Sequence, residues 1–201
     1  MADCAIEDMS FFDLYSCFPS AVQIARDMLG IAPDDPRPLS VTGGLAYQGG
    51  PGNNYTTHSI ATMMEKLRQQ PGTTGLLTGL GWYLTKHSVG IYSTVPPTTA
   101  WQRTDPATYQ ATIDAQPRTE LNQEPQGEAT VETYTVTYDR EGAPQTGVIV
   151  ARLADGRRCF AQVTDNRSVL ENLATEEVIG RSGVRLLYTS DAADEKVRGG
   201  G

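Results

Sequence analysis

The chain contains two histidines, His58 and His87, and each lies beside a glycine-rich segment. An imidazole titrates near neutral pH, so either residue is a candidate general acid or base. His58 lies in the first turn of an expected helix that follows the glycine-rich loop 43–54. The free amides and the dipole of a helix N-terminus favour a developing negative charge. This arrangement suits an oxyanion or acyl-thioester site, although a tight turn before a capped helix is the commoner meaning of the spacing.

Two further side chains have reactive groups near the same segments. Lys86 is next to His87 and is a candidate phosphate ligand, or it belongs to a surface loop anchored by two aromatic residues. Cys17 precedes an expected helix, and a helix N-terminus activates a thiol as a nucleophile. A lone cysteine between aromatic residues is more often a small buried hydrophobe. Cys4 and Cys159 are too scattered to form a metal cluster or a disulfide framework with it.

Composition restricts the classes of partner. Among 201 residues, 24 are acidic and 16 basic, so the formal net charge is -8. This charge argues against a nucleic-acid binder, which needs a surplus of Lys and Arg to neutralise phosphates. A surface stripe of Arg140, Arg152, Arg157 and Arg158 would favour single-strand binding, but such arginines are more often a solvated face. No apolar run of about 18 residues predicts a membrane span, and the acidic N-terminus lacks the features of a secretory signal. We therefore expect a cytoplasmic protein without a bound metal.

The hydrophobic pattern divides the chain into four parts: 1–95, a proline-rich linker at 96–127, a strand-rich part at 128–185, and a tail at 186–201. The tail resembles the translation of a transposase adapter used in sequencing libraries. We expect it to make no substantial packing contacts, with the native chain cut near Arg185.

The first part combines helical and strand periodicities. Apolar spacing predicts helices at about 20–29 and 57–69, packed on strands near Leu76 and Ile91. This order of elements is typical of an α/β layered fold.

The strand-rich part alternates as antiparallel strands do. Asp155-Gly156 predicts a tight hairpin, and Ser168 is expected to cap a short helix after it. The natural interpretation is a small antiparallel β domain, in the form of a sheet or a barrel.

Four segments between residues 10 and 94 are more specific than this general pattern. They are Asp13-Leu14-Tyr15-Ser16-Cys17-Phe18-Pro19-Ser20-Ala21, Thr42-Gly43-Gly44-Leu45, Gly49-Gly50-Pro51-Gly52-Asn53-Asn54-Tyr55 and Gly81-Trp82-Tyr83-Leu84-Thr85-Lys86-His87. They resemble the C-terminal half of the thiolase superfamily, in the branch of acetyl-CoA acetyltransferases and thiolase-like proteins type 1. Residues from about 98 to 185 resemble the small additional C-terminal domain of that branch.

The resemblance implies the C-terminal part of a thiolase-like layered fold, with a coenzyme A thioester as substrate or ligand and no covalently bound cofactor. It also implies a missing N-terminal thiolase half that carries the acylated cysteine. In this interpretation Tyr15 occupies the position of the polar oxyanion-hole partner, and His58 or His87 moves a proton. The loop residues that would bind and polarise the thioester are Gly49, Gly50, Pro51, Gly52, Asn53 and Asn54.

The sequence departs from the ordinary thiolase pattern at two positions. Gly50 stands where the loop histidine is expected, and the later turn Thr78-Gly79-Leu80-Gly81 has no cysteine. Two functions therefore remain open. One is a fragment of an acyl-CoA-binding acyltransferase; the other is a non-catalytic protein that binds coenzyme A, an acyl thioester or a lipid.

Overall fold

The computed structural model describes residues 2–82, 84–100 and 102–184. These residues form two compact units, which divide between Thr108 and Tyr109. Each unit contains its own sheet and its own buried apolar clusters.

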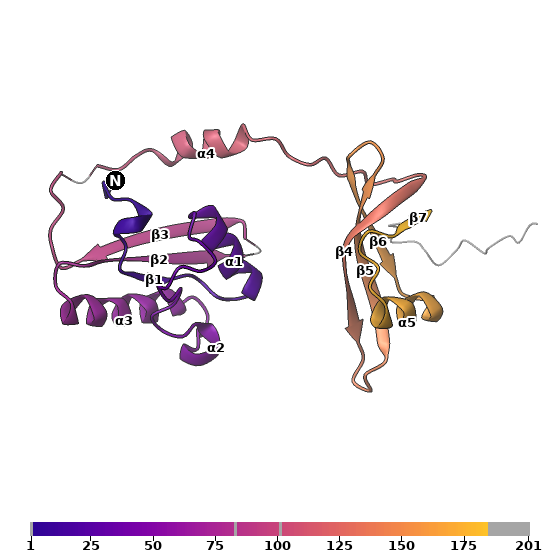
Figure 1. The fold of residues 1–201 in the computed structure, drawn as a ribbon, viewed down its shortest axis with the longest axis horizontal. Coiled ribbons are helices and arrows are strands. Elements are labelled where there is room, and N and C mark those ends of the chain that lie inside the picture. Colours follow the sequence, from indigo (N-terminus) through magenta and orange to yellow (C-terminus); the bar gives the residue numbers. More distant parts are fainter. Residues whose placement is uncertain (1, 83, 101, 185–201) are drawn as a thin grey trace, which may run out of the picture. The chain divides into compact units, whose positions relative to one another are not determined.

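The first unit is built on a three-stranded sheet with the order β1-β2-β3 (Figure 1). Strand β1 (Phe11–Asp13) runs parallel to β2 (Thr74–Gly81), and β2 runs antiparallel to β3 (Lys86–Ser93). The hairpin between β2 and β3 brings Gly79 opposite Ser88 and Gly81 opposite Lys86.

Helices cover both faces of this sheet (Figure 1). After the short 3-10 helix Ile6–Asp8, helix α1 (Pro19–Met28) packs on the face that carries Phe12 and Leu76. Helix α3 (Tyr55–Gln69) buries Met63 and Leu67 against Leu77 on the opposite face. The one-turn helix α2 (Leu45–Gln48) lies within the glycine-rich loop. The sheet is thus the middle layer of three, which confirms the predicted α/β layered fold.

Alternation along β1 decides which side chains meet which helix, because successive strand residues point to opposite faces. Phe12 and Leu14 are fully buried in the cluster on the α1 side. Phe11 packs on the α3 side, and so does the fully buried Asp13, whose side chain meets Tyr55 of α3. A carboxylate is thereby placed beneath the N-terminal half of α3.

The second unit is an antiparallel sheet with the order β6-β5-β4-β7, curled as a half-barrel (Figure 1). Its elements in chain order are β4 (Glu128–Tyr138), β5 (Pro144–Leu153), β6 (Arg158–Val163), α5 (Arg167–Thr175) and β7 (Ser182–Val184). At the outer edge of β6, Leu121 forms a parallel bridge with Arg158. The predicted small β domain is therefore confirmed as an open sheet.

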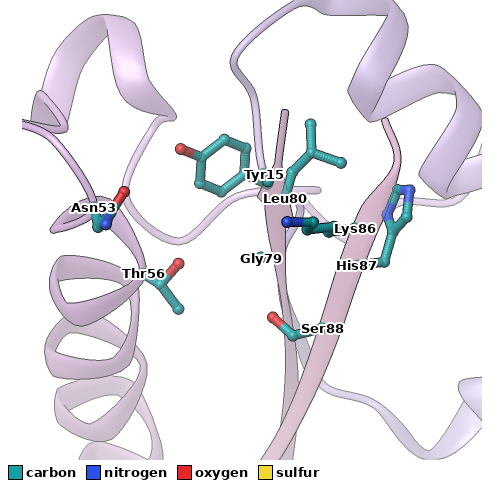
Figure 2. A pocket seen from close by; sticks show the side chains of 9 residues that line it. Tyr15, Asn53, Thr56, Gly79, Leu80, Lys86, His87 and Ser88 are labelled. Carbon is teal, nitrogen blue, oxygen red and sulfur yellow. The ribbon is translucent and has the colours of Figure 1, made fainter. Parts of the chain in front are cut away.

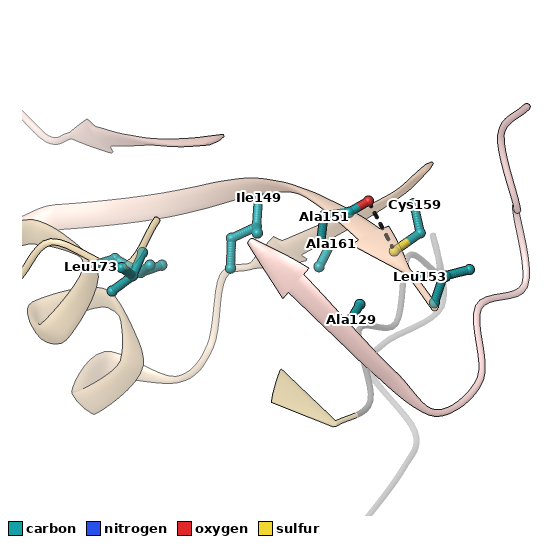
Figure 3. Packing of buried hydrophobic residues seen from close by; sticks show 8 residues of the cluster. Ala129, Ile149, Ala151, Leu153, Cys159, Ala161 and Leu173 are labelled. Atoms are coloured by element: carbon teal, nitrogen blue, oxygen red, sulfur yellow. Dashed lines mark hydrogen bonds between the residues drawn. The ribbon is translucent and has the colours of Figure 1, made fainter. Parts of the chain in front are cut away.

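Small residues make up half of the buried core cluster of the second unit (Figure 3). Cys159 and Ala151 are fully buried, and the Cys159 Sγ–H donates to the Ala151 carbonyl at 3.6 Å. Burial raises the pKa of the Cys159 thiol, which behaves as a small hydrophobe. A Cβ atom on Gly147 would lie 2.7 Å from Leu173 Cδ1, so this glycine allows α5 to approach β5 closely.

Most predicted elements of the chain are confirmed. The helix expected at 20–29 is Pro19–Met28, and that expected at 57–69 is Tyr55–Gln69. The hairpin turn contains Asp155 and Gly156, with Gly156 at φ 87°.

Three local predictions need correction or extension. Strand β3, expected near Ile91, extends back to Lys86, and the proline-rich segment expected to be a linker contains helix α4 (Pro106–Asp114). Asn166, not Ser168, caps α5, because its side chain accepts a hydrogen bond from the Val169 amide. The expectation for the tail 186–201 lies outside the described residues.

Replacing Asn166 with alanine is expected to lower the free energy of unfolding of the second unit by about 1 kcal/mol. The Asn166 Oδ1 atom accepts from the Val169 N–H at 3.1 Å, and alanine leaves that amide without its capping partner. Urea unfolding followed by circular dichroism measures the loss. Ser168→Ala is the matched control and should change stability by less than about 0.5 kcal/mol; an equal loss in both variants would contradict the assignment of the cap.

Candidate functional site

A pocket of about 290 Å³ lies between the N-terminus of α3 and the β2–β3 hairpin (Figure 2). Its lining residues are Tyr15, Asn53, Thr56, Gly79, Leu80, Gly81, Lys86, His87 and Ser88. We call it the polar pocket, because phenol, amide, hydroxyl and ammonium groups meet there. These groups donate hydrogen bonds and suit a carbonyl oxygen or an anion.

The polar groups come from three parts of the fold, and the first is the exit of β1, which supplies Tyr15. Asn53 and Thr56 approach from the α3 side, whereas Lys86 and Ser88 project from β3 (Figure 2). Gly79 keeps this space open, since a Cβ atom there would lie 2.5 Å from Ser88 Oγ and 3.4 Å from Thr56 Oγ1. Glycine in the strand thus allows α3 and β3 to face each other across a polar gap.

Tyr15 is held from two directions at the exit of β1. Its backbone N–H donates to Thr78 Oγ1 at 2.9 Å. Its ring packs edge-on against Tyr55, with 5.3 Å between the ring centroids. The side chain predicted from the resemblance as an oxyanion partner therefore lines the polar pocket, with its ring packed against Tyr55.

His87 borders the polar pocket from the other face of β3. It alternates with Lys86 and Ser88 along the strand, and its imidazole lies away from Thr56 (Figure 2). Nε2 is 2.9 Å from the Leu84 carbonyl oxygen. Because a carbonyl only accepts, Nε2 carries the proton, and Nδ1 of the neutral ring is the basic atom.

His58 does not line the polar pocket. Its Nε2 atom is 3.0 Å from the Asn54 amide nitrogen. Its Nδ1 atom is buried and has no hydrogen-bond partner among the described residues. The structure therefore brings Tyr15 and His87 to one pocket and leaves His58 beside the loop.

The glycine-rich loop contributes one lining residue, Asn53. Gly49 and Gly52 adopt φ angles of 69° and 56°, which favour glycine. Gly50, at the position where the resemblance expects a histidine, packs against α3. A Cβ atom there would lie 3.0 Å from Tyr55 Cβ and 3.2 Å from Leu45 Cδ2. Pro51 and Asn54, like these glycines, do not line the polar pocket.

A second pocket of about 480 Å³ adjoins the first and shares Tyr15 and Leu80 with it. Its other lining residues are Cys17, Phe18, Ser20, Trp82 and Leu84. We call it the apolar pocket. Trp82 and Leu84 both have φ 55°, an uncommon conformation for bulky residues. Cys17 lies in this pocket and not in the polar one.

Sequence reasoning did not single out Thr56, Ser88 or Leu80. Thr56 and Ser88 are ordinary hydroxyl residues in a helix and a strand, and only the packing of α3 opposite β3 brings them together. Gly79 could have indicated this part of the pocket, because a glycine within a strand often marks a place where another segment approaches the backbone closely.

Other candidate sites receive no support from the described residues. No group of three or more His, Cys, Asp or Glu side chains in this part of the chain could hold a metal ion. None of its helices is long and apolar enough to cross a membrane.

The arginines considered as a nucleic-acid stripe are mostly paired. Arg152 and Arg158 both bind Glu132, and Arg157 binds Asp155. Hydrogen bonds from Arg158 and then Arg152 lower the pKa of Glu132, so this carboxylate keeps its charge and offsets theirs. The pairing favours a solvated salt-bridge cluster over a phosphate-binding surface.

Comparisons with known proteins agree with the geometry. The family model of the thiolase-like protein type 1 additional C-terminal domain matches residues 108–185. A solved structure, the monomeric SCP2-thiolase-like protein type 1 from Mycobacterium smegmatis, is similar with 42% identity and a TM-score of 0.77. The match covers 90% of this chain and 39% of that one, so the chain spans about two fifths of the relative's length. None of the curated proteins compared with the chain matches it. Residues 108–185 thus match the additional C-terminal domain of the thiolase-like proteins type 1, and the chain as a whole is similar in fold and sequence to a solved thiolase-like protein of that type.

Proposed function

We propose that the two adjoining pockets bind the thioester end of an acyl-CoA, and that the chain is the corresponding part of a thiolase-superfamily acyltransferase. The observation that carries this proposal is the junction of the pockets at Tyr15 and Leu80. A thioester combines a carbonyl oxygen, which accepts hydrogen bonds, with an apolar acyl group. Sites for such ligands are mostly apolar with a few placed polar groups.

The polar pocket supplies donors for the thioester oxygen. Tyr15, Asn53 and Lys86 offer a phenol O–H, an amide N–H and an ammonium. Attack on a thioester places negative charge on that oxygen, and preorganised donors stabilise the charge. His87, with Nδ1 as its basic atom, is the candidate proton carrier at the border of the pocket.

The alternative function is a non-catalytic protein that binds coenzyme A, an acyl thioester or a lipid. It is favoured by the chemistry of the polar pocket, whose described lining contains no thiol. Gly50 supports the same alternative, because its close contacts with Tyr55 and Leu45 leave little room for a histidine side chain. The two functions share one binding site and differ in turnover.

Replacing Lys86 with alanine is expected to weaken acetyl-CoA binding roughly 10- to 100-fold, since a hydrogen bond to a charged group contributes about 1.5–3 kcal/mol. Isothermal titration calorimetry of the chain with acetyl-CoA measures the change. Lys66→Ala is the matched control: Lys66 lies in the last turn of α3 and does not line either pocket. The proposal fails if acetyl-CoA does not bind saturably, or if both lysine variants bind it as the unaltered chain does.

A further inference from the structure

Asp13 is a fully buried carboxylate that accepts hydrogen bonds from six donors. Its Oδ1 atom accepts from the hydroxyls of Tyr55 and Ser59, both at 2.8 Å. Its Oδ2 atom accepts from the hydroxyls of Ser40 and Thr42, both at 3.0 Å, and from the backbone amides of Val41 and Thr42 at 3.1 and 3.2 Å. Among the described residues, Asp13 forms no ion pair with Lys, Arg or His.

Burying a carboxylate costs free energy unless protein groups replace the hydrogen bonds that water would make to it. Here hydroxyls and amides do so without a cation. Burial raises the pKa of Tyr55, so its phenol keeps the proton that it donates. The donors lie 27 to 46 residues from Asp13 along the chain, and the carboxylate therefore joins segments that are distant in sequence.

The joined segments are those that form the polar pocket. Tyr55 and Ser59 belong to α3, and Asn53 and Thr56 beside Tyr55 line the pocket. Tyr15, two residues after Asp13, lines it from the other side and packs against the Tyr55 ring.

The segment 40–42 leads into the Gly43-Gly44 turn that opens the glycine-rich loop. The Thr42 hydroxyl connects β1 to α3, because it donates to Asp13 and lies 2.7 Å from the Tyr55 hydroxyl. It also accepts from the Gly44 amide at 3.0 Å, which fixes the start of the loop.

We propose that Asp13 is the positioning residue of the thioester pocket, holding the exit of β1, the start of the glycine-rich loop and the first turns of α3 in one register. The inference rests on the proposed function of the pocket. Asp13 acts on a ligand through Tyr15, Asn53 and Thr56 and does not itself line the pocket.

The test is Asp13→Asn in the full chain, which keeps the size of the side chain but presents an NH₂ group to donors. Acetyl-CoA affinity is measured by calorimetry at a temperature where the protein is fully folded. Hydrogen exchange is followed separately on peptides from 40–44 and 53–59. We expect affinity to fall roughly 10- to 100-fold and exchange to accelerate in both segments. Exchange in the second unit should stay unchanged.

Asp35→Asn is the matched control. Asp35 is also a largely shielded carboxylate of the first unit, but it binds Arg37, whose guanidinium donates to the carbonyls of Ile6 and Met9. We expect this variant to lose stability while its acetyl-CoA affinity and its exchange at 53–59 stay unchanged. That difference separates a positioning role from a general loss of packing.

Ser59→Ala keeps the proposal testable if Asp13→Asn does not fold. It removes one donor from Oδ1 and should lower affinity about threefold while accelerating exchange in the first turns of α3. The proposal is overturned if these variants lower the melting temperature but leave exchange at 40–44 and 53–59 as in the unaltered chain. If the unaltered chain binds no acetyl-CoA, the proposed function fails, and the exchange measurement still decides whether Asp13 holds the segments together.

Discussion

The purified chain is expected to cleave acetoacetyl-CoA no faster than a buffer blank. Thiolytic cleavage needs a cysteine to hold the acyl group and a base to manage the proton. Among the described residues of the polar pocket there is no thiol. Cys159 is buried in the other unit and Cys4 is exposed away from the pockets. Cys17, in the adjoining apolar pocket, is the remaining candidate nucleophile.

A spectrophotometric cleavage assay with coenzyme A tests this expectation, with Cys17→Ala as its control. Turnover that disappears in Cys17→Ala would overturn the prediction and make Cys17 the nucleophile. Turnover that persists in the variant would also contradict it and would locate the nucleophile elsewhere. Binding of acetyl-CoA without turnover is the expected combination, and it would leave activity to a chain that also carries the acylated cysteine.

Replacing Phe12 with alanine is expected to lower the free energy of unfolding of the first unit by about 3–5 kcal/mol. Phe12 is fully buried in the middle layer, where its cluster includes Met9, Leu14 and Leu76. The Arg37 guanidinium lies over its ring at 4.8 Å from the centroid, a contact that alanine also removes. The loss therefore combines apolar transfer, a cavity and a cation–π contact.

Calorimetric unfolding measures the effect and tests the independence of the two units. The buried cluster around Phe12 and the buried cluster around Leu173 share no residue. We expect Phe12→Ala to shift the transition of the first unit alone, and Leu173→Ala to shift that of the second alone. A single transition that moves equally in both variants would show that the units unfold as one.

Helices with an apolar face were predictable because their apolar residues recur at helical spacing along a short stretch of sequence. Met63 and Leu67 are one helical turn apart, and this spacing predicts α3 even when the sheet that it covers is not known. Helix α4 has no buried residue and starts at Pro106 in a proline-rich segment, so no stripe reveals it. The start of β3 was missed because Lys86, His87 and Ser88 are polar and exposed, and only pairing with 79–81 makes them a strand.

The site was predictable where residue type alone carries chemistry. Tyr15, Lys86 and His87 were candidates from the sequence, and all three border one pocket. His58 was equally prominent in the sequence, but helical geometry places it beside Asn54 rather than at the pocket.

The role of Asp13 could not be predicted from its neighbours in the sequence. In Phe11-Phe12-Asp13-Leu14 a carboxylate among apolar residues gives no sign of its donors. Those donors arrive from 40–42 and from α3 once the chain has folded back on β1. Long-range packing, rather than local propensity, creates the network.

The parallel bridge at the outer edge of β6 has a consequence for self-association. Arg158 donates its amide to the Glu120 carbonyl at 2.9 Å and accepts from the Asn122 amide at 2.8 Å. An uncovered strand edge is a template for pairing with another chain. Residues 120–122 therefore cover part of the β6 edge and protect it from pairing with other chains. A shortened second unit that starts at Glu128 would leave β6 uncovered, so that the β6 edges of two copies could pair with each other.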